Sequence, residues 1–388
     1  MTNKLKLTAV IGGACLALGL SAQSAHATSY SCSYASVSGY SSVTSTYSGC
    51  AANSTNNQAS TVATANAVLS TAATASAKLI SNRVSAAVGG QSSFNVAANG
   101  FSASTGVAAG NYAGKIGAWI SGAWSNLDDS NTDTAFKGDV FSTMVGADYK
   151  LTSKTVVGLA LGYENIGLDT AYNGYAGNKG KLDGDGYTIA PYVGSELVPG
   201  VSGNVSVGYT RVNYDTTRYD PASGNKLTGS TDADRYFIDA SVSGSHTVAP
   251  NWTLYGKTSL FYAHEDKDAF TETETNTAGS STVGTVANSS VNNDFGQAAL
   301  EARIAYKYQM VEPYALLGVS YDFAKDESPI AVGQSKSSLD DQDFAAKWGG
   351  GLNLKVSPNV VGNIEAYSVE FRDNYNEYGV TGGLRVKF

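Results

Sequence analysis

From Lys115 to the C-terminus, apolar and polar residues alternate along the sequence with a period of two. The clearest run is FGQAALEARIAYKY, residues 295–308. Its charged and amide side chains share one face of a strand: Gln297, Glu301, Arg303 and Lys307. The opposite face is apolar. In a soluble barrel the polar face meets water outside, whereas in a membrane barrel the apolar face meets lipid and the polar face lines the lumen.

Twelve segments carry this alternation. They lie at about 115–125, 138–150, 155–166, 185–196, 203–215, 233–246, 251–264, 293–309, 312–325, 342–355, 359–371 and 375–388. Most are ten residues or longer, against the five or six that are usual in soluble sheets, and they match a tilted membrane crossing of about 9–11 residues. The sequence therefore predicts an all-β fold: a twelve-stranded antiparallel transmembrane β-barrel over residues 114–388, embedded in outer-membrane lipid.

The connections between these segments alternate between tight turns and longer polar loops. The tight turns lie near residues 153, 199, 249, 311 and 358, and the longer loops near 126–137, 167–184, 216–232, 265–292, 326–341 and 372–374. This asymmetry is typical of an up-and-down barrel with turns on the periplasmic side and loops outside. The outer loops contain many of the acidic residues. We expect these loops to offer a surface to a host or surface ligand.

The N-terminus has the pattern of an export signal. Lys4 and Lys6 precede an apolar run from Leu7 to Leu20, and Ala25-His26-Ala27 has the small-x-small form of a cleavage site. Residues 1–27 are therefore predicted to be a cleaved signal peptide.

Residues 28–57 are rich in Ser, Tyr, Thr and Asn and contain no charged side chain. Such a segment has little with which to build a core. Cys32 and Cys50 are the only cysteines left once the signal peptide is removed. In an oxidising compartment this pair most simply forms one disulfide, so we predict a short surface segment that is either pinned by this bond or flexible.

Residues 58–88 have helical periodicity. Apolar side chains recur at helical spacing: Val62, Leu69, Ala73, Ala77, Ile80, Val84 and Val88. About thirty residues give a rod of roughly 45 Å, enough to cross an outer membrane inside a pore. Two interpretations stay open, a lumen helix and a helix packed on another domain. Residues 89–113 form a Gly-, Ser- and Ala-rich spacer.

Composition excludes several kinds of function. The net charge of −8 argues against a nucleic-acid partner. No phosphate-binding loop, nucleophile elbow or zinc spacing occurs, so no cofactor, metal or enzymatic activity is predicted. The one alternative is the motif His264-Glu265-Asp266 at the predicted outer rim, where a histidine beside a carboxylate could activate water.

Several runs resemble the autotransporter β-domain of Gram-negative bacteria. They are GAWISGAWSNLDD, then GDVFSTMVGADYKLTSKTVVGLALGYENI, then the terminal EYGVTGGLRVKF, in family order over residues 115–388. The resemblance implies a twelve-stranded outer-membrane barrel whose lumen holds an α-helix, with an upstream passenger carried to the cell surface. It also implies that the barrel assembly machinery reads the terminal strand, with Phe388 as its contact. The chain departs from the family in its passenger, because only residues 28–57 precede the helix.

Charged residues on the polar faces of the strands are expected to line the lumen. They are Lys257, Glu301, Arg303, Lys307, Lys347, Arg385 and Lys387. Both signs are present, so the set fits either a helical plug held by polar contacts or a selective channel. The sequence thus predicts an outer-membrane autotransporter-type barrel that exposes or translocates its short N-terminal segment through the pore. The alternative is a channel or surface adhesin without a passenger.

Overall fold

The computed structural model describes most of the barrel and the helix before it. The described residues are 64–88, 101–103, 116–131, 135–175, 177–220, 223–326, 342–357 and 360–386. The predicted signal peptide, Cys32, Cys50, Lys387 and Phe388 lie outside them, as does most of the spacer. For Arg385 only the backbone is described.

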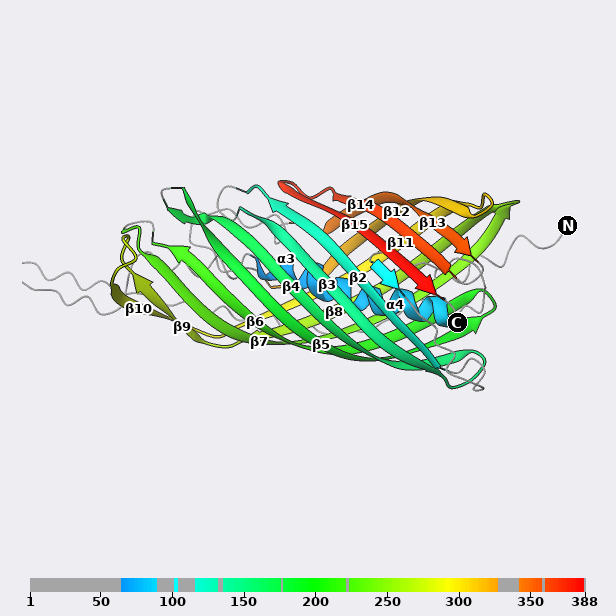
Figure 1. Cartoon of the computed structure of the whole chain (residues 1–388), viewed down its shortest axis with the longest axis horizontal. Coiled ribbons are helices and arrows are strands. Elements are labelled where there is room, and N and C mark those ends of the chain that lie inside the picture. Colours follow the sequence, from blue (N-terminus) through cyan, green and yellow to red (C-terminus); the bar gives the residue numbers. More distant parts are fainter. Residues whose placement is uncertain are drawn as a thin grey trace, which may run out of the picture. The chain divides into compact units, whose positions relative to one another are not determined.

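Twelve antiparallel strands form a closed ring (Figure 1). They are β2 (Ile116–Asp129), β3 (Phe136–Lys150), β4 (Thr155–Tyr175), β5 (Asn178–Val198), β6 (Val201–Tyr219), β7 (Lys226–Ala249), β8 (Trp252–Lys267), β11 (Val291–Tyr306), β12 (Val311–Lys325), β13 (Phe344–Ser357), β14 (Val360–Glu370) and β15 (Tyr375–Val386). Each pairs with the next of these strands, and β15 pairs with β2. The predicted twelve-stranded antiparallel barrel is confirmed.

The joint between the last and first strands is short. β15 and β2 pair only from Tyr375–Asp129 to Val380–Trp124. Nearer the start of β2, the short strand β1 (Phe101–Ala103) pairs with Ile120 to Gly122. Residues that precede the barrel in sequence therefore complete part of its closing edge.

The short connections define one end of the barrel, which we call the turn end; the other is the loop end. At the turn end, Gly200 and Asn251 have positive φ angles of 83° and 67°. Glycine and asparagine tolerate this conformation, which explains their use in tight turns.

At the loop end the prediction of a long loop at 167–184 is wrong. β4 and β5 continue and pair up to Tyr175 and Asn178. The segment 265–292 likewise contains a hairpin of β9 (Phe270–Thr275) and β10 (Thr282–Asn288), which pairs with β7. Above the membrane a strand can have water on both faces, so the apolar alternation weakens although the backbone pairing continues.

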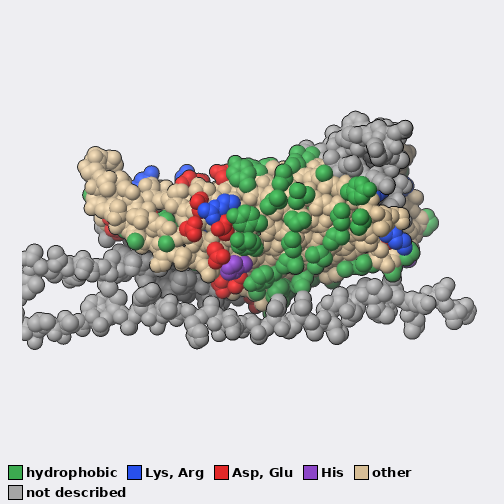
Figure 2. Space-filling view, turned by 90° about the horizontal axis from the view of Figure 1, so that it is seen from below, with side chains coloured by type: hydrophobic (Ala, Val, Ile, Leu, Met, Phe, Trp, Pro, Cys, Tyr) green, Lys and Arg blue, Asp and Glu red, His purple; other side chains and the backbone are tan. Residues whose placement is uncertain are grey.

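The barrel is apolar outside and filled inside. Large hydrophobic side chains such as Leu161, Leu300 and Leu317 are about half exposed or more, at 52%, 53% and 68%. Figure 2 shows a hydrophobic band on one face of the barrel, and charged side chains gather where the band ends. This is the inverted arrangement expected for a barrel in lipid. In the described part of the chain, no helix has both the length and the apolar character that a membrane crossing requires.

One helical rod runs inside the barrel. It consists of α3 (Ala65–Val68), a π-helical turn η1 (Leu69–Ala73) and α4 (Thr74–Val88). Its residues contact β2 through β7 and most are buried. The predicted lumen helix is confirmed, and the alternative of packing on another domain is wrong. Alanine, serine and threonine keep the rod narrow enough for the lumen.

The rod has a defined direction. Near its start, the Asn66 amide donates to the Asp326 backbone carbonyl, 2.9 Å away, just beyond β12 at the loop end. Further along, the Ser81 hydroxyl bonds that of Ser241 at 2.7 Å, close to the turn end. The helix therefore begins toward the loop end and ends toward the turn end.

A buried ion pair fixes the β9–β10 hairpin. Arg218 on β6 donates from Nε to both Glu272 carboxylate oxygens on β9, at 3.0 Å. The two side chains are 4% and 2% exposed. Between them on β7 lies Gly229, where an added Cβ would meet the Glu272 side chain at 2.9 Å. A glycine at this position leaves room for the pair to cross β7.

We expect Glu272→Ala to loosen the hairpin. It leaves a buried guanidinium without its partner, which costs roughly 3–5 kcal/mol. Amide exchange in β9 and β10 should become much faster, while exchange in β12 should not change. The control is Glu274→Ala, because Glu274 is less buried and accepts only from the Asn225 amide among the described residues. Equal exchange in the two variants would contradict this role of the ion pair.

Candidate functional site: the barrel lumen

The apolar side of the helix rests on one wall of the lumen. Leu69, Ala73, Ala77, Ile80 and Val84 recur at helical spacing and are at most 1% exposed. They share a buried cluster with wall residues that include Trp119, Met144, Ala160, Ala190, Tyr192 and Phe237, from β2 to β7. This cluster fixes which side of the helix faces β2 to β7.

The start of the helix enters a second apolar cluster nearer the loop end. Ala67, Val68 and Ala72 join it from the helix. The wall contributes Leu127, Phe136, Val140, Ile166, Leu168, Leu182, Val212, Tyr214, Ala233 and Tyr375. Two stacked clusters therefore hold the rod along its length.

The opposite wall, formed by β8 and β11 to β15, is charged. Arg303 bonds Glu301 at 3.0 Å and Glu365 at 3.2 Å. Lys347 lies 3.6 Å from Glu301 and 3.8 Å from Glu365, and 4.2 Å above the Tyr367 ring. The Tyr314 hydroxyl donates to Glu365 at 2.8 Å. The structure thus brings three residues of the sequence-predicted set together, with both signs in one network.

Sequence reasoning missed Glu365, Tyr367 and Tyr314 in this network. Glu365 and Tyr367 are two residues apart on β14 and point to the same face, so the period of two could have identified them. Of the other predicted lumen residues, Lys257 donates to the Asn82 side-chain oxygen of the helix at 2.8 Å. Lys307 lies just beyond β11 and is exposed at the turn end.

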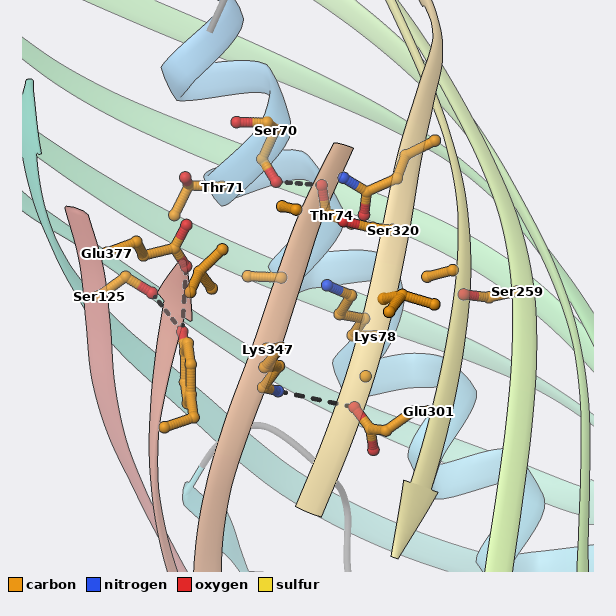
Figure 3. Close-up of a pocket in the computed structure, with 18 of the residues that line it drawn as sticks. Ser70, Thr71, Thr74, Lys78, Ser125, Ser259, Glu301, Ser320, Lys347 and Glu377 are labelled. Atoms are coloured by element: carbon orange, nitrogen blue, oxygen red, sulfur yellow. Dashed lines mark hydrogen bonds and ion pairs between the residues drawn. The ribbon is translucent and has the colours of Figure 1, made fainter. Parts of the chain in front are cut away.

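A crevice separates the polar side of the helix from this charged wall (Figure 3). The helix contributes Ser70, Thr71, Thr74, Ala75, Lys78 and Asn82. Residues of the wall include Lys257, Ser259, Glu301, Ser320, Lys347 and Glu377. The cavity volume is about 100 Å³. The helix therefore has two sides with different partners, a packed apolar wall and a polar crevice.

A second charge network lies nearer the loop end. Arg235 on β7 is fully buried and bonds Glu164 on β4 at 2.6 Å and Glu265 on β8 at 2.7 Å. The Tyr214 hydroxyl on β6 accepts from Arg235 at 2.9 Å and donates to Glu265 at 3.1 Å. Both carboxylates are 1% exposed. The network ties four strands of the barrel together.

The motif His264-Glu265-Asp266 is not assembled into one site. Glu265 points into the lumen, where it bonds Arg235. His264 is partly exposed; its Nδ1 lies 2.7 Å from Asp294 and its Nε2 3.1 Å from Asp266. Both ring nitrogens of His264 therefore contact carboxylates of partly exposed aspartates, and Glu265 takes no part in these contacts.

The sequence matches the family model of the autotransporter beta-domain over residues 118–366, more than half of the 388 residues. The chain belongs to the autotransporter β-domain family. No curated protein matched the chain. This β-domain is an outer-membrane barrel of the autotransporter type, as the resemblance of the sequence implied.

Three solved autotransporter domains align with this chain, one of them with a TM-score above 0.5. The translocator domain of the autotransporter NalP from Neisseria meningitidis aligns with a TM-score of 0.55 and 13% identity, covering 71% of this chain and 89% of that one. The β-domain of the Bordetella autotransporter BrkA aligns at 0.49 with 14% identity over 71% and 100% of the two chains. The transport unit of AIDA-I from Escherichia coli aligns at 0.45 with 15% identity over 72% and 92%. The NalP alignment supports a shared fold.

We expect Ala77→Leu to destabilise the autotransporter barrel. Ala77 is fully buried in the cluster between the helix and the wall, and extra methylene groups in a packed core cost typically 1–3 kcal/mol. The temperature of unfolding, measured by the gel mobility of the folded barrel, should fall. Ala75→Leu is the matched control and should cost less, because Ala75 is only partly buried, at the edge of this cluster, and lines the crevice. An equal loss in both variants would argue against tight packing at Ala77.

We expect Arg235→Leu to cost about 3–5 kcal/mol, because it leaves two buried carboxylates without their cation. Arg211→Leu is the control. Arg211 bonds Asp232 and Asp234 at 2.9 and 2.7 Å, but its side chain is 43% exposed, and ion pairs in water contribute little to stability. Denaturant unfolding of the two variants measures the difference. If Arg235→Leu is no less stable than Arg211→Leu, the buried network does not stabilise the barrel.

Proposed function

We propose that this autotransporter-type barrel inserts in the outer membrane and exposes or translocates its short N-terminal segment, residues 28–57, through the pore. Residues 1–27 would direct export and be removed. Residues 58–88 would remain in the lumen as a plug. No enzymatic role is proposed.

The direction of the helix carries this proposal. Asn66 near its start bonds Asp326 at the loop end, while Ser81 bonds Ser241 near the turn end. If the long connections face outward, a chain that enters the lumen at Thr64 comes from the outer side. This direction supports a surface location for the preceding segment.

The remaining expectations follow from this proposal. The wall residues Lys257, Glu301, Arg303 and Lys347 would hold the polar side of the plug. Arg385 and Lys387 would face the lumen as well, and Lys307, which is exposed at the turn end, would lie at the mouth of the lumen. A Cys32–Cys50 disulfide would pin the surface segment. The terminal strand with Phe388 would contact the barrel assembly machinery.

The long strands at the loop end favour a second candidate, a surface adhesin. β4, β5, β6 and β7 have 21, 21, 19 and 24 residues, and the β9–β10 hairpin widens this wall. A membrane crossing needs only about 9–11 residues, so much of this sheet extends beyond the bilayer. Such a sheet offers a surface for a host or surface ligand.

Removing the helix should open the pore. A helix is about 10 Å wide, so deletion of residues 58–88 should raise single-channel conductance in planar bilayers on the order of tenfold. Deletion of residues 28–57 is the control and should leave the conductance unchanged. If both deletions conduct like the intact chain, the helix is not a plug and the adhesin or channel interpretation gains support.

The location of the segment needs its own test. We expect Ser36→Cys, in a chain with Cys32→Ser and Cys50→Ser, to react with a membrane-impermeant maleimide on intact cells. A cysteine at Ser357, near the turn end of β13, should react only after the outer membrane is permeabilised. Failure of Ser36→Cys to react on intact cells, with reaction after permeabilisation, would contradict surface exposure.

A further inference from the structure

The crevice is elongated and follows the helix. On the helix it extends from Ser70 to Asn82, twelve residues or about 18 Å of rise. On the wall it extends from Lys257 on β8 to Tyr375 at the loop-end start of β15. The lining hydroxyl groups, those of Ser70, Thr71, Thr74, Ser125, Ser259 and Ser320, can bond water along this length. The packed apolar side of the helix offers no comparable route.

Cationic side chains predominate in the lining. Lys78, Lys257, Lys347 and Arg372 line the crevice, against Glu301 and Glu377. The two carboxylates are engaged: Glu301 bonds Arg303 at 3.0 Å, and Glu377 accepts from the Tyr367 and Tyr375 hydroxyls at 3.3 Å. Arg372 is paired with Asp322 at 2.6 Å.

Among the described residues, the amines of Lys78 and Lys257 have no carboxylate as close as those that pair with Lys347 and Arg372. Lys257 bonds the neutral Asn82 side chain, and Lys78 makes no hydrogen bond or ion pair with another described residue. Both are attracted only at longer range: Lys78 by Glu377, Glu301 and Asp239, and Lys257 by Asp239 and Glu301. Glu301 and Glu377 have the closer partners named above, and Asp239 on β7 is 2% exposed and does not line the crevice. Figure 3 shows the Lys78 side chain projecting from the helix toward the wall strands that carry Glu301 and Lys347.

We propose that the intact protein, with its helix in place, conducts small ions along this crevice, and that Lys78 gives the path a preference for anions such as chloride. The apolar side of the helix is sealed by packing, so the polar side is the route. This inference needs the helix in the lumen but does not depend on translocation of residues 28–57.

The test uses the full mature chain in planar bilayers under a KCl gradient. We expect a small, steady conductance with a reversal potential of anionic sign. A unit charge within several ångströms of a partly hydrated path changes ion energies enough to alter selectivity on the order of tenfold. Lys78→Met should therefore weaken the preference, and Lys78→Glu should reverse it. Lys179→Met is the control, because Lys179 is 57% exposed and does not line the crevice.

A blocking variant gives an independent measurement. Ser320 on β12 lines the crevice, and Ser320→Trp should abolish the small conductance while the folded gel mobility is kept. A silent intact chain, or a reversal potential that Lys78→Glu leaves unchanged, would overturn the proposal. Either result is separate from the plug test, because deletion of residues 58–88 can still open the pore. Conversely, an anionic conductance that depends on Lys78 would support the crevice path even if residues 28–57 stay inside the cell.

Discussion

Backbone hydrogen bonding in lipid is the constraint on which the rest of this structure depends. An unpaired peptide group in the hydrocarbon region costs several kcal/mol, so a sheet in the membrane must close on itself. Here twelve strands close through the pairing of β15 with β2, which extends over only a few residues. β1 pairs with Ile120 to Gly122 on the same strand and satisfies further backbone groups there. Closure therefore involves the segment that links the lumen helix to the barrel.

Once the ring is closed, the lumen must be filled by side chains or by water. In this barrel the helix fills one part, and a polar crevice that can hold water occupies another. The helix buries Leu69, Ala77 and Ile80 against the wall from β2 to β7, which gives a packed interface like that of a soluble core. Toward β8 and β11 to β15 it presents hydroxyls, Lys78 and Asn82. One rod is thus held by hydrophobic packing on one side and faces a polar crevice on the other.

Arg235 and Arg303 are tolerated inside the barrel because they are paired. A buried ion is expensive, and the cost is offset only by good geometry and further hydrogen bonds. Arg235 meets two carboxylates and a tyrosine hydroxyl; Arg303 meets Glu301 and Glu365. These networks join strands that are not neighbours in the ring. They also place polar groups in the lumen, where the helix or water can bond them. The same ion pairs therefore stabilise the barrel and make its lumen polar.

The sequence by itself determined the twelve strands, their inverted polarity and the helix. These features are local. Apolar residues that recur every two positions in a strand, or every 3.6 positions in a helix, show which of its sides faces an apolar environment. The same alternation placed Glu301, Arg303 and Lys347 on the polar faces of their strands. Only the tertiary structure decided that Glu265 bonds Arg235, that β4 and β5 extend through residues 167–184, and which wall the helix packs against. Partners depend on how strands far apart in sequence are staggered around the closed ring, and no local pattern records that stagger.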